Sequence, residues 1–197
     1  MSADPTLSGP LKPGATIGIL GGGQLGRMLA LAAARLGLKT HIYSDESESC
    51  AMLVAAASTR GHYDDEQALE RFASQCDVVT FEFENVPDKT AHFLTAHVPV
   101  APNGRSLAIA QDRFLEKSFV SGLGIATAPF RDVTSEGAAR EAFAALGGPA
   151  VLKTRRLGYD GKGQQKVASA DDCKRAFVAM GGVPCILEKF EIGRAHV

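Results

Sequence analysis

The sequence predicts an α/β fold, with a Rossmann-like parallel-sheet domain over residues 15–103 and an incomplete α+β region over residues 104–190. In the first part, short apolar strands alternate with helical patterns, which is typical of a parallel sheet covered by helices. In the second part, a glycine-rich turn joins two strand-like runs, which indicates an antiparallel hairpin. Residues 1–14 are polar and rich in proline, so we expect a flexible lead-in and no signal peptide.

The composition is that of a soluble globular protein. Of the 197 residues, 45% are hydrophobic and 22% are charged, which is ample for a core. The formal net charge of -1 gives no electrostatic basis for binding nucleic acid or a membrane surface, so any basic site must be local. No apolar stretch is long enough to cross a bilayer, and the four cysteines form no CxxC pair. We therefore expect a cytoplasmic protein with reduced thiols and a small anionic ligand.

The first part opens with a strand–turn–helix–strand unit. A buried strand, Ala15–Leu20, runs into the glycine turn Gly21–Gly26, and a second strand, Thr40–Ser44, ends at Asp45. Between the strands, apolar residues recur at helical spacing: Leu25, Met28, Leu29, Ala32 and Leu36. The N–H groups and the dipole at the start of such a helix favour an anion, which points to a dinucleotide such as NAD. Alternatively, the glycines only allow tight packing of the strand against the helix.

Two carboxylates end the next strand. Glu66–Gln75 is predicted to be a helix, and Asp77–Glu84 an apolar strand that ends in Glu82 and Glu84. These two residues share one face and lie at the carboxyl end of the strand, where open α/β sheets bind their ligands. Alternatively, they only solvate the strand end. The remaining elements of this part are a short helix and a short edge strand, at 88–94 and 98–100.

The second part begins with one continuous helix predicted over Ser106–Ser121. The elements predicted after it are a strand, a helix, a second helix and a final strand, at 130–133, 135–146, 171–180 and 184–190. Thr134 or Ser135 is the expected cap of the helix that follows them. We expect the final strand to form an exposed sheet edge that is prone to aggregate.

Within this part, the stretch Ala150–Gln164 indicates a phosphate-binding loop. Its apolar start places Lys153 before the loop, Asp160-Gly161 marks a turn, and Gln165–Ser169 is the return strand. Glycines at 158, 161 and 163 allow backbone N–H groups to approach an anion closely, because no Cβ stands in the way. The surrounding cations are Arg155, Arg156 and Lys162. The loop is therefore predicted to lie over phosphates, with a solvated basic hairpin as the alternative.

An ordered set of motifs resembles one known family. The motifs are Gly21–Met28, Phe83–Pro87, Gln111–Arg113 with Glu116–Lys117, Lys153, Gly158–Gln164 and Leu187–Lys189. Each motif is weak alone, but together they are similar to the N5-carboxyaminoimidazole ribonucleotide synthetase family of ATP-grasp ligases, from about Ala15 to Phe190. Leu157 departs from the family pattern, in which many members carry a further glycine, and should only stiffen the entry to the loop.

The resemblance implies a ligase of purine (IMP) biosynthesis. ATP would phosphorylate bicarbonate to carboxyphosphate, and the activated carboxyl group would pass to the amino nitrogen of 5-aminoimidazole ribonucleotide. The products would be N5-carboxyaminoimidazole ribonucleotide, ADP and phosphate. Such chemistry needs positioning and charge neutralisation more than a protein nucleophile. The resemblance further implies a pre-ATP-grasp domain at 15–103, the first part of an ATP-grasp domain at 104–190 with its flap subdomain at about 130–190, a Mg²⁺ cofactor and a homodimer.

Site residues follow from the same resemblance. The set implied to bind ATP is Arg113, Lys153, Gly158, Tyr159, Asp160, Gly161, Lys162, Gly163, Gln164, Glu188, Lys189 and Phe190. The set implied to bind the substrate ribonucleotide is Gly23, Gln24, Leu25, Glu82 and Glu84. Arg113 and Lys153 would hold the phosphates, residues 158–164 would form a mobile flap, and the backbone of residues 188–190 would meet the adenine. The first glycine turn would then serve the ribonucleotide and not NAD, and no catalytic residue is expected in this chain.

The end of the chain departs from the family. Residues 191–197 match the translation of a common sequencing adapter, so we expect them to be a non-native tail. The carboxylates that would bind Mg²⁺ are implied to lie beyond Val197, and we therefore expect this chain to lack ligase activity.

Three alternatives stay open. An NAD-dependent oxidoreductase would use Gly21–Gly26 and Asp45 but would leave Lys153 unexplained. Another ATP-grasp ribonucleotide ligase, which uses formate or glycine, would share the fold. A non-catalytic fragment would bind a nucleotide without turnover.

Overall fold

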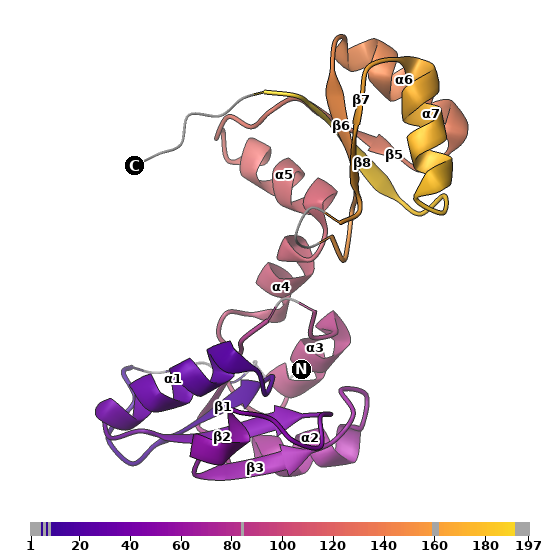
Figure 1. Cartoon of the computed structure of the whole chain (residues 1–197). Helices are drawn as coiled ribbons and strands as arrows, with labels where there is room; N and C mark the ends of the chain where they lie inside the picture. The colour runs from indigo at the N-terminus through magenta and orange to yellow at the C-terminus, as the bar shows by residue number, and fades with distance from the viewer. Residues whose placement is uncertain (1–4, 6, 8, 84, 159–161, 192–197) are drawn as a thin grey trace. The chain divides into compact units, whose positions relative to one another are not determined.

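The computed structural model describes residues 5, 7, 9–83, 85–158 and 162–191 (Figure 1). The chain divides into two compact units, Met1–Ala108 and Ile109–Val197. Among the described residues, none of the helices has the length and apolar composition needed to cross a membrane.

A four-stranded parallel sheet forms the centre of the first unit, as predicted. Its strands are β1 (Thr16–Leu20), β2 (Lys39–Ser44), β3 (Ala57–Arg60) and β4 (Val78–Phe81), in the order β3-β2-β1-β4. The sequence pattern does not reveal β3, because this edge strand is short and mostly exposed and lacks apolar alternation. The predicted edge strand at 98–100 is reduced to one bridge, between Val100 and Val79 of β4.

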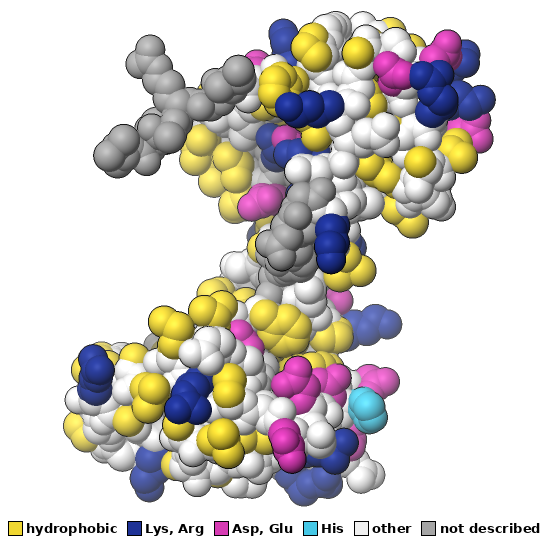
Figure 2. Space-filling view, viewed as in Figure 1, with side chains coloured by type: hydrophobic (Ala, Val, Ile, Leu, Met, Phe, Trp, Pro, Cys, Tyr) yellow, Lys and Arg dark blue, Asp and Glu magenta, His cyan; other side chains and the backbone are white. Residues whose placement is uncertain are grey.

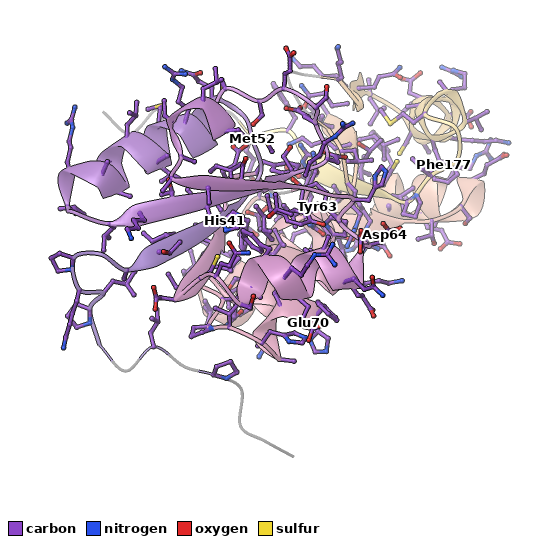
Figure 3. All side chains as sticks on the ribbon, turned by 90° about the horizontal axis from the view of Figure 1, so that it is seen from below. His41, Met52, Tyr63, Asp64, Glu70 and Phe177 are labelled. Carbon is purple, nitrogen blue, oxygen red and sulfur yellow. The ribbon has the colours of Figure 1, made fainter. Side chains whose placement is uncertain are left out.

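Helices cover both faces of this sheet. Helix α1 (Gln24–Arg35) lies on one side, and α2 (Glu66–Ala73), on which Glu70 is labelled, lies on the other (Figure 3). Helix α3 (Asp88–Thr95) joins α2 in the main core, which contains Leu20, Tyr43, Leu69, Phe72, Val79 and Leu94. A short 3-10 helix, η1 (Met52–Val54), contacts α1.

The apolar stripe that suggested α1 points outward. Leu25, Met28, Leu29, Ala32 and Leu36 are all exposed. The buried residues of α1 are instead the small ones, Gly26, Ala30 and Ala33. The large apolar side chains of this helix lie on the surface, where hydrophobic side chains are visible over α1 (Figure 2).

In the second unit, a four-stranded antiparallel sheet packs against two helices. Its strands are β5 (Phe130–Val133), β6 (Ala150–Thr154), β7 (Gln164–Val167) and β8 (Cys185–Lys189), in the order β5-β8-β6-β7. The helices are α6 (Glu136–Leu146), which the Ser135 side chain caps, and α7 (Ala170–Ala179). The prediction of an exposed edge at the final strand is wrong, because β8 pairs with β5 on one side and β6 on the other.

The helix predicted over Ser106–Ser121 is two helices. Helix α4 (Gly104–Ala110) ends before Asp112, and α5 (Arg113–Gly122) begins after it. The Asp112 carboxylate accepts hydrogen bonds from the N–H groups of Phe114 (3.0 Å) and Leu115 (3.2 Å). Because its side chain accepts these N–H groups, Asp112 starts a new helix at this point, and α4 does not continue through it.

Candidate functional site

The antiparallel sheet of the second unit has one apolar and one polar face. Strand periodicity places Leu152, Cys185 and Leu187 toward the core that α6 and α7 complete. The opposite face carries the alternate residues, which the register aligns in two rows: Lys166–Val151–Glu188 and Gln164–Lys153–Ile186. Charged side chains therefore gather on the face that these two helices leave free.

A cavity of about 420 Å³ opens on this polar face. Its lining residues are Ala128, Val151, Lys153, Gln164, Lys166, Glu188, Lys189, Phe190 and Glu191. The volume falls within the range of sites for small ligands. Five residues of the predicted ATP set line it: Lys153, Gln164, Glu188, Lys189 and Phe190. The sequence therefore identified much of one wall of this cavity.

One buried carboxylate of the cavity lining binds two lysines. Glu188 is 8% exposed, and its Oε2 accepts from Lys153 Nζ at 3.0 Å. Lys117 Nζ of α5 lies 3.4 Å from the same oxygen. The motifs that carried the family resemblance included Lys117, but its place on a helix far along the chain from both partners gave no sign of this contact.

Another lysine of the cavity lining, which belongs to none of the predicted site sets, lies over an aromatic ring. The Nζ atom of Lys166 is 4.5 Å from the ring centroid of Phe190. This distance is that of a cation–π interaction, and it joins β7 to the segment after β8. Lys166 thus adds a further positive charge to the cavity lining.

Arg113 braces the loop entry after β6. Its guanidinium donates to the carbonyl oxygens of Thr154 (3.0 Å) and Gly158 (2.6 Å). A Cβ atom on Gly158 would lie 2.7 Å from Arg113 Nη1, so a side chain at this position would displace the Arg113 guanidinium. Gly163, at the other end of the loop, has a φ of 68° and accepts from the Thr154 N–H at 2.8 Å. The predicted loop residues Tyr159, Asp160 and Gly161 lie outside the described residues, and Lys162 is exposed.

An ion pair behind the loop fixes the start of α5. Arg155 donates from Nε to both carboxylate oxygens of Asp112 (2.9 and 3.0 Å), and its Nη1 reaches Asp132 at 3.2 Å. Burial by itself raises the pKa of Asp112, but the hydrogen bonds from Arg155 and from the Leu115 N–H outweigh it and leave the pKa below its ordinary value. The same pair raises the pKa of Arg155, chiefly through the Asp112 hydrogen bond. Both groups are therefore held in their charged forms.

In the first unit, a carboxylate lies at the glycine turn. Glu82 Oε1 accepts from the Gly23 N–H at 2.9 Å, so Glu82 satisfies a free N–H at the start of α1, where no side chain of the helix itself caps. A Cβ atom on Gly23 would lie 2.9 Å from that oxygen. The structure thus brings the predicted Gly23 and Glu82 together.

The other predicted substrate residues have different surroundings. The Gln24 side chain accepts from the Cys50 thiol at 3.6 Å. Leu25 is 56% exposed, and Glu84 lies outside the described residues.

A larger hollow of the second unit, of about 840 Å³, lies between α5 and β5. Its walls are mainly apolar, among them Phe114, Ile125 and Pro129, and it contains none of the predicted site residues. Because recognition of a phosphate needs cations and N–H groups, the smaller cavity on the polar face is the better candidate. Within the described ranges, no group of three or more His, Cys, Asp or Glu side chains is gathered closely enough to hold a metal ion.

Comparison with known families matches both parts of the chain. Residues 14–111 match the ribonucleotide synthetase pre-ATP-grasp domain, and residues 118–192 match the ATP-grasp domain.

Curated relatives include two proteins named N5-carboxyaminoimidazole ribonucleotide synthase. The one from Pseudomonas aeruginosa is 50% identical over 174 residues, which is 88% of this chain and 48% of the relative. The one from Brucella melitensis is 50% identical over 182 residues, which is 91% of this chain and 50% of the relative. The chain therefore spans about half the length of the curated relatives that it matches.

Solved structures agree in fold. An ADP complex of an N5-carboxyaminoimidazole ribonucleotide synthetase superposes with a TM-score of 0.88 at 38% identity, over 95% of this chain and 50% of that one. An Aspergillus clavatus synthase in complex with ADP and 5-aminoimidazole ribonucleotide superposes with a TM-score of 0.81 at 28% identity, over 92% and 48%. The α/β fold class, with a parallel-sheet unit followed by an ATP-grasp unit, is confirmed.

Proposed function

Because the chain belongs to the N5-carboxyaminoimidazole ribonucleotide synthase family of ATP-grasp ligases, we propose that it serves the ATP-dependent carboxylation of 5-aminoimidazole ribonucleotide in purine biosynthesis. Bicarbonate would take the γ-phosphoryl group of ATP to give carboxyphosphate and ADP. The amino nitrogen of the ribonucleotide would then attack the carboxyl carbon, and phosphate would leave. The observation that carries this proposal is the cavity on the polar face of the second sheet, where Lys153, Gln164, Glu188 and Phe190 meet.

ATP is assigned to this cavity. Lys153 would bind the phosphates, and the strand end Glu188–Phe190 would offer its backbone to the adenine edge. The segment Gly158–Gln164 would act as a flap, and Arg113, which already binds the carbonyl oxygens at the flap entry, would add a second cation. Relatives crystallised with ADP or ATP support a nucleotide as the ligand.

The ribonucleotide substrate is assigned to the glycine turn of the first unit. Gly23, Gln24 and Leu25 would present the N–H groups at the start of α1, and one or both of Glu82 and Glu84 would accept hydrogen bonds from the nucleotide. In the structure, Glu82 accepts from the Gly23 N–H, which keeps the N–H group and the carboxylate close together.

The groups of the chain fit a mechanism without a protein nucleophile. Burial raises the pKa of the Cys76 thiol to about 12 and those of Cys173 and Cys185 to about 11, so these thiols stay protonated at neutral pH. Catalysis would then depend on charge neutralisation by Lys153 and Arg113 and on alignment of the reactants.

We assign Mg²⁺ to the reaction on chemical grounds. Mg²⁺ would neutralise the negative charge that develops during ATP-dependent phosphoryl transfer. The described residues gather no metal-binding group, so no step is assigned to a metal ligand of this chain. A cytoplasmic location and a homodimer complete the proposal.

Nucleotide binding provides the first test. We expect ADP and ATP to raise the melting temperature of the chain and to bind in calorimetry, and NAD to do neither. Stabilisation by NAD alone would favour an oxidoreductase built on Gly21–Gly26 and Asp45.

Because the two family models also suit other ribonucleotide ligases, the substrate needs a separate test. Phosphate release that depends on 5-aminoimidazole ribonucleotide and bicarbonate, measured on a protein that spans the whole length of the curated relatives, would support the proposal. Release that depends on formate or glycine would assign the other ligase class.

A further inference from the structure

Lys153 has two partners to satisfy if the proposed function holds. In the structure its Nζ binds the Glu188 carboxylate at 3.0 Å. For the nucleotide, the same ammonium must face the phosphates in the cavity. The more Lys153 turns to the phosphates, the less it balances Glu188, and a buried carboxylate without a cation is strongly destabilising.

Lys117 is placed to remain with Glu188. Its Nζ lies 3.4 Å from the same carboxylate oxygen. Lys153 lines the cavity, whereas Lys117 is not among the described lining residues and approaches Glu188 from beside Phe130 of the neighbouring strand β5. Both lysine side chains are mostly buried, at 26% and 21% exposure for Lys153 and Lys117, so solvent screens the three charges only in part.

The surroundings of Lys117 hold it in that position. Its Nζ lies 6.0 Å from the ring centroid of Phe130, which the sheet register places opposite Glu188. One turn earlier on α5, Phe114 packs edge-to-face on Phe130 with 5.6 Å between ring centroids. Arg155 in turn lies over Phe114, with its Cζ 4.9 Å from the ring centroid. Lys117 is therefore attached to the sheet through α5, independently of Lys153.

We propose that Lys117 is a positioning residue that keeps the buried Glu188 charge-balanced, so that Lys153 can exchange this carboxylate for the phosphates of a nucleotide. The inference rests on the proposed nucleotide site and assigns a residue that acts through Glu188 and Lys153 without touching the ligand. Without Lys117, Lys153 would be the only nearby cation for Glu188 among the described contacts, and binding of phosphates would leave the carboxylate unpaired.

A double-mutant cycle with ADP as the probe tests this inference. The dissociation constant for ADP is measured by calorimetry for the 197-residue chain and for its K117M, K117R, E188Q and K117M/E188Q variants. We expect K117M to weaken ADP binding by roughly tenfold, in line with couplings measured between close charges, and K117R to retain it. In the E188Q background, no buried carboxylate needs a partner, so the additional K117M change should have little effect.

Each other outcome contradicts the inference in a recognisable way. An equal loss from K117M in both backgrounds would mean that Lys117 binds the phosphates directly. A lower melting temperature with unchanged ADP affinity would mean that Lys117 only supports the fold. If the unmodified chain fails to bind ADP, the proposed function itself is wrong, and the inference falls with it.

Discussion

The Asp112–Arg155 pair allows a direct test of what holds the start of α5 in place. Asp112 has two functions in the structure: it caps α5 through the N–H groups of Phe114 and Leu115, and it binds Arg155 with both oxygens. Asp112→Asn keeps an oxygen for the cap but removes the charge, whereas Asp112→Ala removes both. Comparison of the two variants therefore separates the ion pair from the cap.

The expected magnitudes follow from the burial of the pair. Loss of a capping side chain costs about 1 kcal/mol. Removing one partner of a buried ion pair costs about 3–5 kcal/mol, but Arg155 is 18% exposed and keeps Asp132 at 3.2 Å, so we reduce this to about 2 kcal/mol. The free energy of unfolding should fall by about 2 kcal/mol in Asp112→Asn and by about 3 kcal/mol in Asp112→Ala.

Urea unfolding followed by circular dichroism measures both values. If the Asp112→Asn variant unfolds within about 0.5 kcal/mol of the unmodified chain, the ion pair contributes nothing measurable to stability. The pH dependence gives an independent check. Since the pKa of Asp112 lies below its ordinary value of 3.8, its contribution is present above pH 3.8 and is lost as the pH falls through the folded-state pKa. The difference in the free energy of unfolding between the unmodified chain and the Asp112→Asn variant should therefore become smaller as the pH falls below 3.8.

Three further changes test other parts of the structure. Leu157 has a φ of 60° and is 76% exposed, so Leu157→Gly should relieve left-handed strain and raise the free energy of unfolding by about 0.5–1 kcal/mol. Leu157→Ala should not raise it, and an unchanged urea midpoint for Leu157→Gly would contradict this expectation. Burial lowers the pKa of His41 below 6.5, so the stability of the first unit should decline as the pH falls below 6.5. In thermal melts recorded across pH, His41→Gln should make this decline smaller. Gly21 has a φ of 112° and faces the Glu82 side chain, so Gly21→Ala should destabilise by about 2 kcal/mol in urea, whereas Gly122→Ala, with open space around it, should cost no such amount.

Local sequence patterns predicted the fold well where they coincide with packing. The strand Phe130–Val133 is as predicted, and of the two predicted caps of the next helix, Thr134 and Ser135, the structure has Ser135. The break at Asp112 was missed because the apolar spacing continues across it, and only the capping hydrogen bonds end one helix and start another. For α1, periodicity alone did not show which face packs, since the small residues and not the leucines lie against the sheet.

The candidate site was predictable only in part, for a similar reason. Lys153 and Glu188 belong to strand ends, and the family resemblance picked out both of them. Lys117 and Lys153 bind the same Glu188 carboxylate because α5, β6 and β8 meet in space. The spacing of these residues along the chain does not indicate this contact. Likewise, the cation–π pair of Lys166 and Phe190 depends on the register of β7 and β8 on either side of β6.

In helix α1, the large apolar side chains are not the ones that are buried. Its contact with the sheet is made by Gly26, Ala30 and Ala33, while Leu25, Met28 and Leu29 face outward and contribute little to the interior. A protein engineer could therefore exchange Met28 and Leu29, which lie outside the proposed substrate set, for glutamate or lysine to improve solubility, at little expense to folding. Their apolar character is accordingly a property of the molecular surface, which the chain can change without rebuilding its core.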